Sequence, residues 1–179
     1  MKAVDLLERN YVVWKGPTRH PFLEAVREGR FPAGAFEVWL AQDYLFVGDA
    51  LAFQARLLAR TPRPARAVLA GGLVAIEAEL GFIEEQAERL GLALDTPRYP
   101  TTVAYRDLLV GLEREPYLAA ITALWTIERA YLEAWRGAAP GQSEYRQFVE
   151  HWTTPEFADY VTGLENAVDD ALRNSDEQE

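Results

Sequence analysis

The run from Phe36 to Leu57 constrains this chain most, because apolar residues recur there at steps of three and four. That spacing places side chains on one side of an α-helix, so it predicts a long amphipathic helix ending near Arg60. The apolar stripe consists of Phe36, Trp39, Leu40, Phe46, Val47, Ala50, Phe53 and Leu57. Such a face is stable only when it packs against other helices, which favours a helical bundle.

One acid, Asp43, lies in the middle of this stripe. A carboxylate there leaves water for an apolar interior, which is costly unless it is hydrogen-bonded, paired or used in chemistry. We therefore interpret Asp43 as a candidate ligand-binding residue. In the structural alternative, Asp43 lies at the edge of the stripe or accepts a buried hydrogen bond from a tyrosine or tryptophan.

The remaining helices follow from periodicity and from proline, glycine and threonine stop and start signals. We expect a break from Gly16 and Pro17 to Pro21, a stop at Gly91, and caps from Thr101 or Thr102 and from Thr154. The predicted helices span residues 5–14, 22–28, 36–60, 65–90, 101–113, 116–136, 143–152 and 156–173. No strand-like alternation is present, so we predict one all-α domain over 1–179, a bundle of about seven helices, with a disordered tail at 174–179.

Charge and cysteine content exclude several classes of function. The chain has 18 Lys and Arg against 28 Asp and Glu, and its net charge of −10 disfavours nucleic acid and anionic membranes as partners. The N-terminus lacks the apolar core of a secretory signal, and the charge-free run 116–127 is too short to cross a bilayer, so we expect a cytoplasmic protein. The absence of cysteine excludes disulfides, thiolate metal sites and a cysteine nucleophile.

A second acid, Glu128, shares an apolar stripe with Tyr117, Ile121, Leu124, Tyr131 and Trp135. Its structural alternative is an ion pair with an arginine of another helix. Two acids on apolar stripes, with aromatic walls nearby, would suit a pocket for a flat polar heterocycle. The candidate walls are Tyr44, Tyr105, Tyr131 and Trp152, although burial in the core is the ordinary role of such residues.

A metal centre needs carboxylates and histidines on facing helices of a bundle. The weak candidates for such a set are Glu77, Glu84, Glu128 and His151. His151 is followed on its helix face by Pro155 and Ala158 and not by further ligands, and His20 is better placed to cap a helix. We therefore expect no metal and no cofactor. Serines are too scarce for a hydrolase triad, and no phosphate-binding glycine loop occurs.

The segments His20-Pro21-Phe22, Gly29, Pro32, Phe36, Leu40 and Gln42-Asp43-Tyr44-Leu45 resemble the N-terminal signature of the TenA (thiaminase II) family. The resemblance extends more weakly through Glu77-Ala78-Glu79-Leu80, Tyr105, and the segments around Leu124 and Trp152. It implies the haem-oxygenase-like helical fold of that family.

The resemblance also implies roles for individual residues. Asp43 would hold the aminopyrimidine part of thiamin or of its breakdown products, Phe46 would line the pocket, and Tyr105 would be the pocket tyrosine. Trp152 stands where the family carries another tyrosine. The nucleophilic cysteine of the family aligns near Leu124, so ordinary covalent cleavage of thiamin cannot run here. The family's final helix, with its catalytic glutamate, has no counterpart that we recognise before the chain ends.

The resemblance to a cysteine-lacking branch implies an aminopyrimidine hydrolase of thiamin salvage, in which Asp43 orients the ring and Glu128 acts as general acid or base. We expect a small-molecule ligand and a homodimer or homotetramer. One alternative is a catalytically inactive homologue that binds a small molecule or a partner. Another is an oxidase on the same fold, either di-iron or similar to enzymes of quinone-cofactor biosynthesis.

Overall fold

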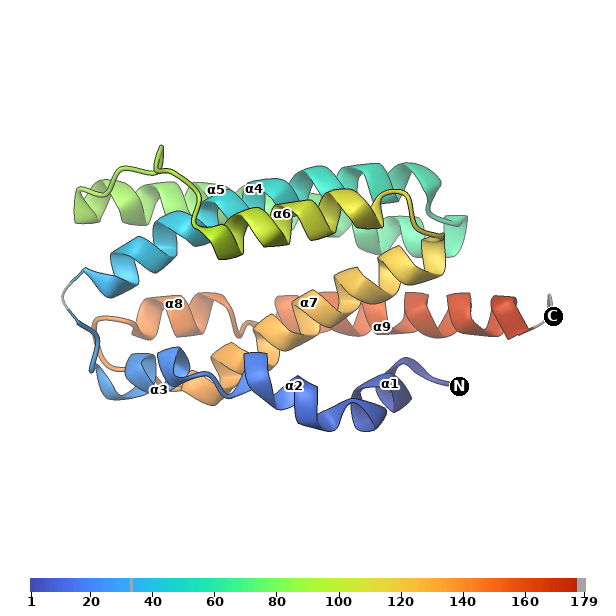
Figure 1. Ribbon diagram of the computed structural model, residues 1–179, viewed down its shortest axis with the longest axis horizontal. Helices are drawn as coiled ribbons and strands as arrows, with labels where there is room; N and C mark the ends of the chain where they lie inside the picture. The colour runs from blue at the N-terminus through green and yellow to red at the C-terminus, as the bar shows by residue number, and fades with distance from the viewer. Residues whose placement is uncertain (33, 177–179) are drawn as a thin grey trace. The chain divides into compact units, whose positions relative to one another are not determined.

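The computed structural model describes residues 1–32 and 34–176, and within these residues the chain forms nine α-helices and no strand (Figure 1). The predicted all-α class is therefore confirmed. The helices divide into two compact units, which we call the central unit (residues 32–120) and the terminal unit (residues 1–31 with those from 121 onward). The single-domain organisation stays a prediction.

The central unit is built on three helices, α4 (Ala35–Arg60), α5 (Arg63–Leu90) and α6 (Pro100–Leu112). Helix α4 packs against both α5 and α6, and the three run side by side in Figure 1. The predicted apolar face of α4 is its packing face, since its buried side chains include Phe36, Leu40, Val47, Ala50, Phe53 and Leu57. Periodicity therefore located this helix to within one residue at its start.

The ends of α5 and α6 test the predicted stop and start signals. Helix α5 stops as predicted at Gly91, which adopts the left-handed conformation with φ of 65°. Helix α6 begins at Pro100, and neither Thr101 nor Thr102 is its N-cap, so that capping prediction is wrong. The Thr102 hydroxyl instead donates to Gln42 Oε1 on α4 at 2.7 Å, and Pro100 starts the helix.

The terminal unit contains α1 (Ala3–Arg9), α2 (Tyr11–Thr18), α3 (Pro21–Glu28), most of α7 (Tyr117–Ala138), α8 (Arg146–His151) and α9 (Pro155–Asp176). The chain start is fixed to α9, because the backbone N–H of Ala3 donates to Asp169 Oδ1 at 2.6 Å. The buried core of this unit includes Trp125, Leu132, Trp135, Leu164 and Val168.

The N-terminal helices differ from the prediction. Asn10 separates α1 from α2, and this break was not predicted. The predicted break over 16–21 is confirmed only at Arg19 and His20, because Gly16 and Pro17 belong to α2 and Pro21 starts α3. Asn10 ends α1 by donating from its side-chain amide to the Leu6 carbonyl at 2.8 Å. Pro17 is tolerated because it lies one residue before the end of α2, where the missing N–H removes only a bond of the last turn.

The C-terminal helices follow the prediction more closely. Helix α8 begins at Arg146, later than the expected 143, and α9 begins at Pro155, where Thr154 Oγ1 accepts from the Phe157 N–H at 3.2 Å and confirms the predicted cap. Helix α9 continues to residue 176 and so enters the stretch expected to be disordered, whereas residues 177–179 lie outside the described part. Among the described residues, every helix is too short or too polar to serve as a membrane span.

Alanine substitutions at Gly71, inside α5, and at Gly91, its C-cap, are expected to change the free energy of unfolding in opposite directions. A Cβ at either Gly71 or Gly91 meets nothing within 4 Å, so only the backbone conformation distinguishes them. Gly91→Ala places an L-residue in the left-handed region and is expected to lower the free energy of unfolding by about 1 kcal/mol. Gly71→Ala removes a glycine from a helix interior and is expected to raise it by about 0.5–1 kcal/mol. Urea denaturation of both variants checks this, and changes of the same sign would contradict it.

Candidate functional site

Asp43 lies on α4 with only 8% of its surface exposed, so its predicted burial is confirmed. Helix α4 places it between Leu40 and Val47, both of which belong to the apolar core. Asp43 interacts with other groups of the protein. Such interactions are the condition under which a buried carboxylate is tolerated. Asp43 lies on α4, the helix that contributes most of the buried apolar side chains of the central unit.

Phe46 and Tyr105, two residues predicted to line a pocket, are in contact. Their ring centroids lie 5.0 Å apart with an interplanar angle of 75°, an edge-to-face arrangement between α4 and α6. Phe46 follows Asp43 by three residues, so the two are neighbours on the surface of α4. Although 44% of Tyr105 is exposed, desolvation raises the pKa of its phenol above the usual 10.0, so it stays a neutral hydrogen-bond donor near pH 7.

The start of α6 is fixed to α4 by the side chain of Gln42. Gln42 Oε1 accepts from the Tyr99 backbone N–H at 2.8 Å and from the Thr102 hydroxyl at 2.7 Å, while Gln42 Nε2 donates to the Pro97 carbonyl at 3.0 Å. One amide thus satisfies three groups of the segment that leads into α6. The family resemblance includes Gln42 in its N-terminal signature but implies no role for this residue.

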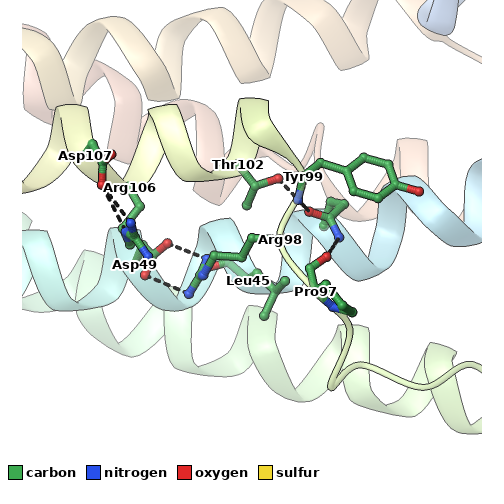
Figure 2. A network of polar contacts seen from close by, with 9 residues as sticks. Leu45, Asp49, Pro97, Arg98, Tyr99, Thr102, Arg106 and Asp107 are labelled. Carbon is green, nitrogen blue, oxygen red and sulfur yellow. Dashed lines mark hydrogen bonds and ion pairs between the residues drawn. The ribbon is translucent and has the colours of Figure 1, made fainter.

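A second attachment lies two turns further along α4. Arg98 donates to both carboxylate oxygens of Asp49, at 2.7 and 3.1 Å, and to the Leu45 carbonyl at 3.2 Å (Figure 2). Both side chains are largely buried, with exposed fractions of 27% for Arg98 and 19% for Asp49, which strengthens a bidentate pair. Together with Gln42, this pair holds the segment before α6 along α4 and thereby sets the position of Tyr105 against Phe46. Sequence reasoning missed Arg98 and Asp49.

Tyr44 and Glu84, also considered for a pocket or a metal site, form a hydrogen bond between α4 and α5. The Tyr44 hydroxyl donates to Glu84 Oε1 at 2.7 Å. This bond raises the pKa of Tyr44, with further contributions from desolvation and from the negative charges of Glu84 and Glu77. Among the described residues, no three His, Asp or Glu side chains gather closely enough to hold a metal ion, and this includes the candidates Glu77, Glu84, Glu128 and His151.

The other three candidates lie in the terminal unit, Glu128 and Tyr131 on α7 and Trp152 just after α8. Tyr131 contacts Trp152 edge to face, with ring centroids 5.7 Å apart. Trp152 is 4% exposed and packs between Trp135, at 4.3 Å, and Phe148, at 5.7 Å, so it belongs to the aromatic core of this unit. Glu128 is half-buried and precedes Tyr131 by three residues.

Leu124, where the resemblance aligns the nucleophilic cysteine of the family, is 2% exposed. It is a packed core residue of α7 and offers no reactive group. The structure therefore places the candidate residues in two sets, Asp43 with Phe46 and Tyr105 in the central unit, and Glu128 with Tyr131 and Trp152 in the terminal unit. Their functional roles stay predictions.

The attachment by Arg98 gives a testable prediction. Arg98→Ala removes a largely buried bidentate pair and is expected to lower the free energy of unfolding by about 1 kcal/mol and to speed proteolysis of residues 91–99. Arg106→Ala is the matched control, because Arg106 pairs with its exposed sequence neighbour Asp107 within the same helix. Its effect is expected to stay within about 0.5 kcal/mol. Equal effects on stability and proteolysis would show that Arg98 does not hold the segment.

Comparison with known proteins supports the family that the sequence resembles. The model of the TENA/THI-4/PQQC family matches residues 7–179, which includes helices of both units. A probable bifunctional TENA-E protein of Glycine max is 29% identical over 97% of this chain and 81% of that protein. An aminopyrimidine aminohydrolase of Halalkalibacterium halodurans is 23% identical over 99% of this chain and 84% of that protein.

Solved structures show the same fold. The crystal structure of a TenA homologue from Pyrococcus furiosus is 30% identical, with a TM-score of 0.92 over 97% of this chain and 86% of that one. A TenA family transcription regulator from Silicibacter sp. TM1040 is 20% identical with a TM-score of 0.87, over 97% of this chain and 81% of that one, which shows a shared fold alone. The expected haem-oxygenase-like fold is thus confirmed.

Proposed function

We propose that this chain, which belongs to the TENA/THI-4/PQQC family, binds a small aminopyrimidine or a related heterocycle through Asp43. The observation that carries the proposal is the burial of Asp43, at 8% exposure, three residues before an aromatic ring that contacts Tyr105. The similarity to an aminopyrimidine aminohydrolase supports a ligand of this class and a role related to thiamin salvage.

The chemistry of these groups suits such a ligand. A carboxylate accepts hydrogen bonds only, so Asp43 selects a molecule that presents amino or ring N–H donors. The rings of Phe46 and Tyr105 favour a flat heterocycle, and the neutral Tyr105 phenol adds a donor for a ring nitrogen. The family resemblance implies that Tyr131 and Trp152, which contact each other in the terminal unit, are further binding residues.

We further propose that the protein hydrolyses a C–N bond of thiamin-derived aminopyrimidines without a cysteine. Water forms the new C–O bond, and the amine leaves with a proton, so a protein group must take a proton from water and return it to nitrogen. Glu128 is the group we assign to this transfer, because a carboxylate exchanges protons in both directions. Leu124, where the resemblance aligns the nucleophilic cysteine of the family, is buried and supplies no nucleophile.

The protein is also proposed to act in the cytoplasm as a homodimer or homotetramer. Large apolar side chains remain exposed on the central unit, with 73% exposure at Val74, 53% at Leu108 and 45% at Val110. Only contiguous exposed apolar patches are typical of surfaces that associate, so the proposed self-association rests on the family resemblance, and these side chains are candidates for the subunit contact.

Asp43→Asn tests the binding proposal, because it keeps the size of the side chain and removes its charge. The dissociation constant for thiamin-derived aminopyrimidines, measured by calorimetry, is expected to rise at least about tenfold, the loss of one charge-assisted hydrogen bond. Asp107→Asn is the matched control, since Asp107 is an exposed aspartate of the same unit. Unchanged affinity in a folded Asp43→Asn variant would refute the assignment.

Glu128→Gln tests the reaction separately. Turnover, followed by release of the amine, is expected to fall about 100-fold or more while the dissociation constant changes little, because the amide cannot transfer the proton. Glu150→Gln, an exposed glutamate of the same unit, serves as the control. Unaltered turnover in Glu128→Gln would end the catalytic assignment. Ligand binding by the unmodified protein without any turnover would support the non-catalytic alternative.

A further inference from the structure

The terminal unit contains a cavity of about 480 Å³ bordered by α2, α3 and the end of α7. None of the residues assigned above to the heterocycle or to proton transfer lines it. Its volume falls in the range of small-molecule sites and exceeds what a single inorganic ion needs. The cavity therefore calls for its own explanation.

The lining of this cavity is basic in a chain that is strongly acidic. Its cations are Lys15, Arg19, Arg27 and Arg136, and its carboxylates are Glu24 and Glu133, which leaves a formal charge of +2 against −10 for the whole chain. A local excess of cations in an acidic protein creates a positive potential that attracts anions over short distances.

One of the two carboxylates is already engaged. Glu133 Oε2 accepts from the Trp14 indole N–H at 2.9 Å, and Glu133 Oε1 accepts from Arg129 Nε at 2.6 Å. Arg129 does not line the cavity and also pairs with Glu165 at 3.4 Å, so it offsets part of the charge of Glu133. The bond from Trp14 also fixes the indole as part of that wall.

Two of the cations have no acidic partner in the described part of the chain. Arg19 and Arg136 form no ion pair with any described residue, whereas Arg27 pairs with Glu28 at 3.6 Å and Lys15 lies 4.4 Å from the centroid of the Tyr11 ring. Both free guanidinium groups are exposed and offer planar sets of donors. They are the groups best able to receive an anion.

The ordinary alternative is that these cations stabilise helix ends. Lys15, Arg27 and Arg136 lie in the last turns of α2, α3 and α7, where a positive charge interacts favourably with the helix dipole. That role is available at any exposed helix end and does not explain why four cations line one cavity. It predicts effects on stability only, so ligand binding separates the two explanations.

We infer that this cavity binds a small phosphorylated molecule, with its phosphate held by Arg19 and Arg136. A phosphate monoester carries a charge of about −2 near pH 7, which matches the charge of the lining, and its oxygens accept the paired donors of guanidinium groups. The Trp14 indole and the Tyr11 ring provide apolar surface for the remainder of the molecule. The inference does not rest on the proposed function, because it involves no residue of the heterocycle site.

Calorimetric titration of the full chain with inorganic pyrophosphate and with inorganic phosphate tests this inference. Saturable binding of pyrophosphate at one site per chain is expected, and Arg19→Gln and Arg136→Gln are each expected to weaken it about tenfold, which corresponds to about 1.4 kcal/mol. Arg146→Gln removes the same charge from an exposed arginine of the same unit outside the cavity, and it is expected to leave the affinity unchanged.

Three outcomes would overturn the inference. The first is the absence of saturable binding, and the second is an equal loss of affinity in Arg146→Gln. The third is loss of pyrophosphate binding in Asp43→Asn, which would place the anion elsewhere. Thermal unfolding of each variant shows whether it is folded, and Lys15→Gln replaces any arginine variant that is not. Failure of aminopyrimidine binding with intact pyrophosphate binding would refute the proposed function alone.

Discussion

Burial of one face of α4 is the constraint on which the central unit depends. Each large apolar side chain on that face contributes about 1.5–3 kcal/mol when it leaves water, and Phe36, Leu40, Phe53 and Leu57 are all at most 3% exposed. These contributions hold the helix in one orientation, and Asp43 enters the interior as a consequence. Rotating the acid outwards would expose those side chains, and the groups that interact with Asp43 offset part of the cost of its burial.

The same helix uses a different face to organise its neighbour. Gln42 and Asp49 are seven residues apart, so they lie on nearly the same side of α4, and together they hold the segment from Pro97 to Thr102. Phe46 lies on this same side, four residues after Gln42 and three before Asp49, whereas Asp43 points to the adjoining side. The polar attachments and the candidate binding residues are thus carried on one rigid element, which lets the attachments set where Tyr105 lies without taking part in binding.

The sequence was most informative where local patterns decide the structure. Periodicity predicts the long helices α4 and α5. A glycine predicts the end of α5 at Gly91, and a threonine before a proline predicts the cap at Thr154. The Arg98–Asp49 pair was not predictable, because the two residues are 49 positions apart and meet only through the packing of α6 on α4. The break at Asn10 was missed because Pro17 is the stronger signal in sequence, although its position near a helix end makes it harmless.

The cavity of the terminal unit was also invisible to the sequence, since its cations come from segments more than a hundred residues apart, around Arg19 and Arg136. Net charge hid it further, because an overall charge of −10 argues against anionic partners when the chain is treated as a whole. The net charge governs the long-range electrostatic field, in which the surplus of carboxylates repels phosphate. Within a few ångströms of Arg19 and Arg136 the local cations dominate, so an anion that binds this protein at all must find donors placed to receive it. Weak, non-specific attraction of anions is suppressed by the rest of the surface, and saturable binding would therefore report on this cavity.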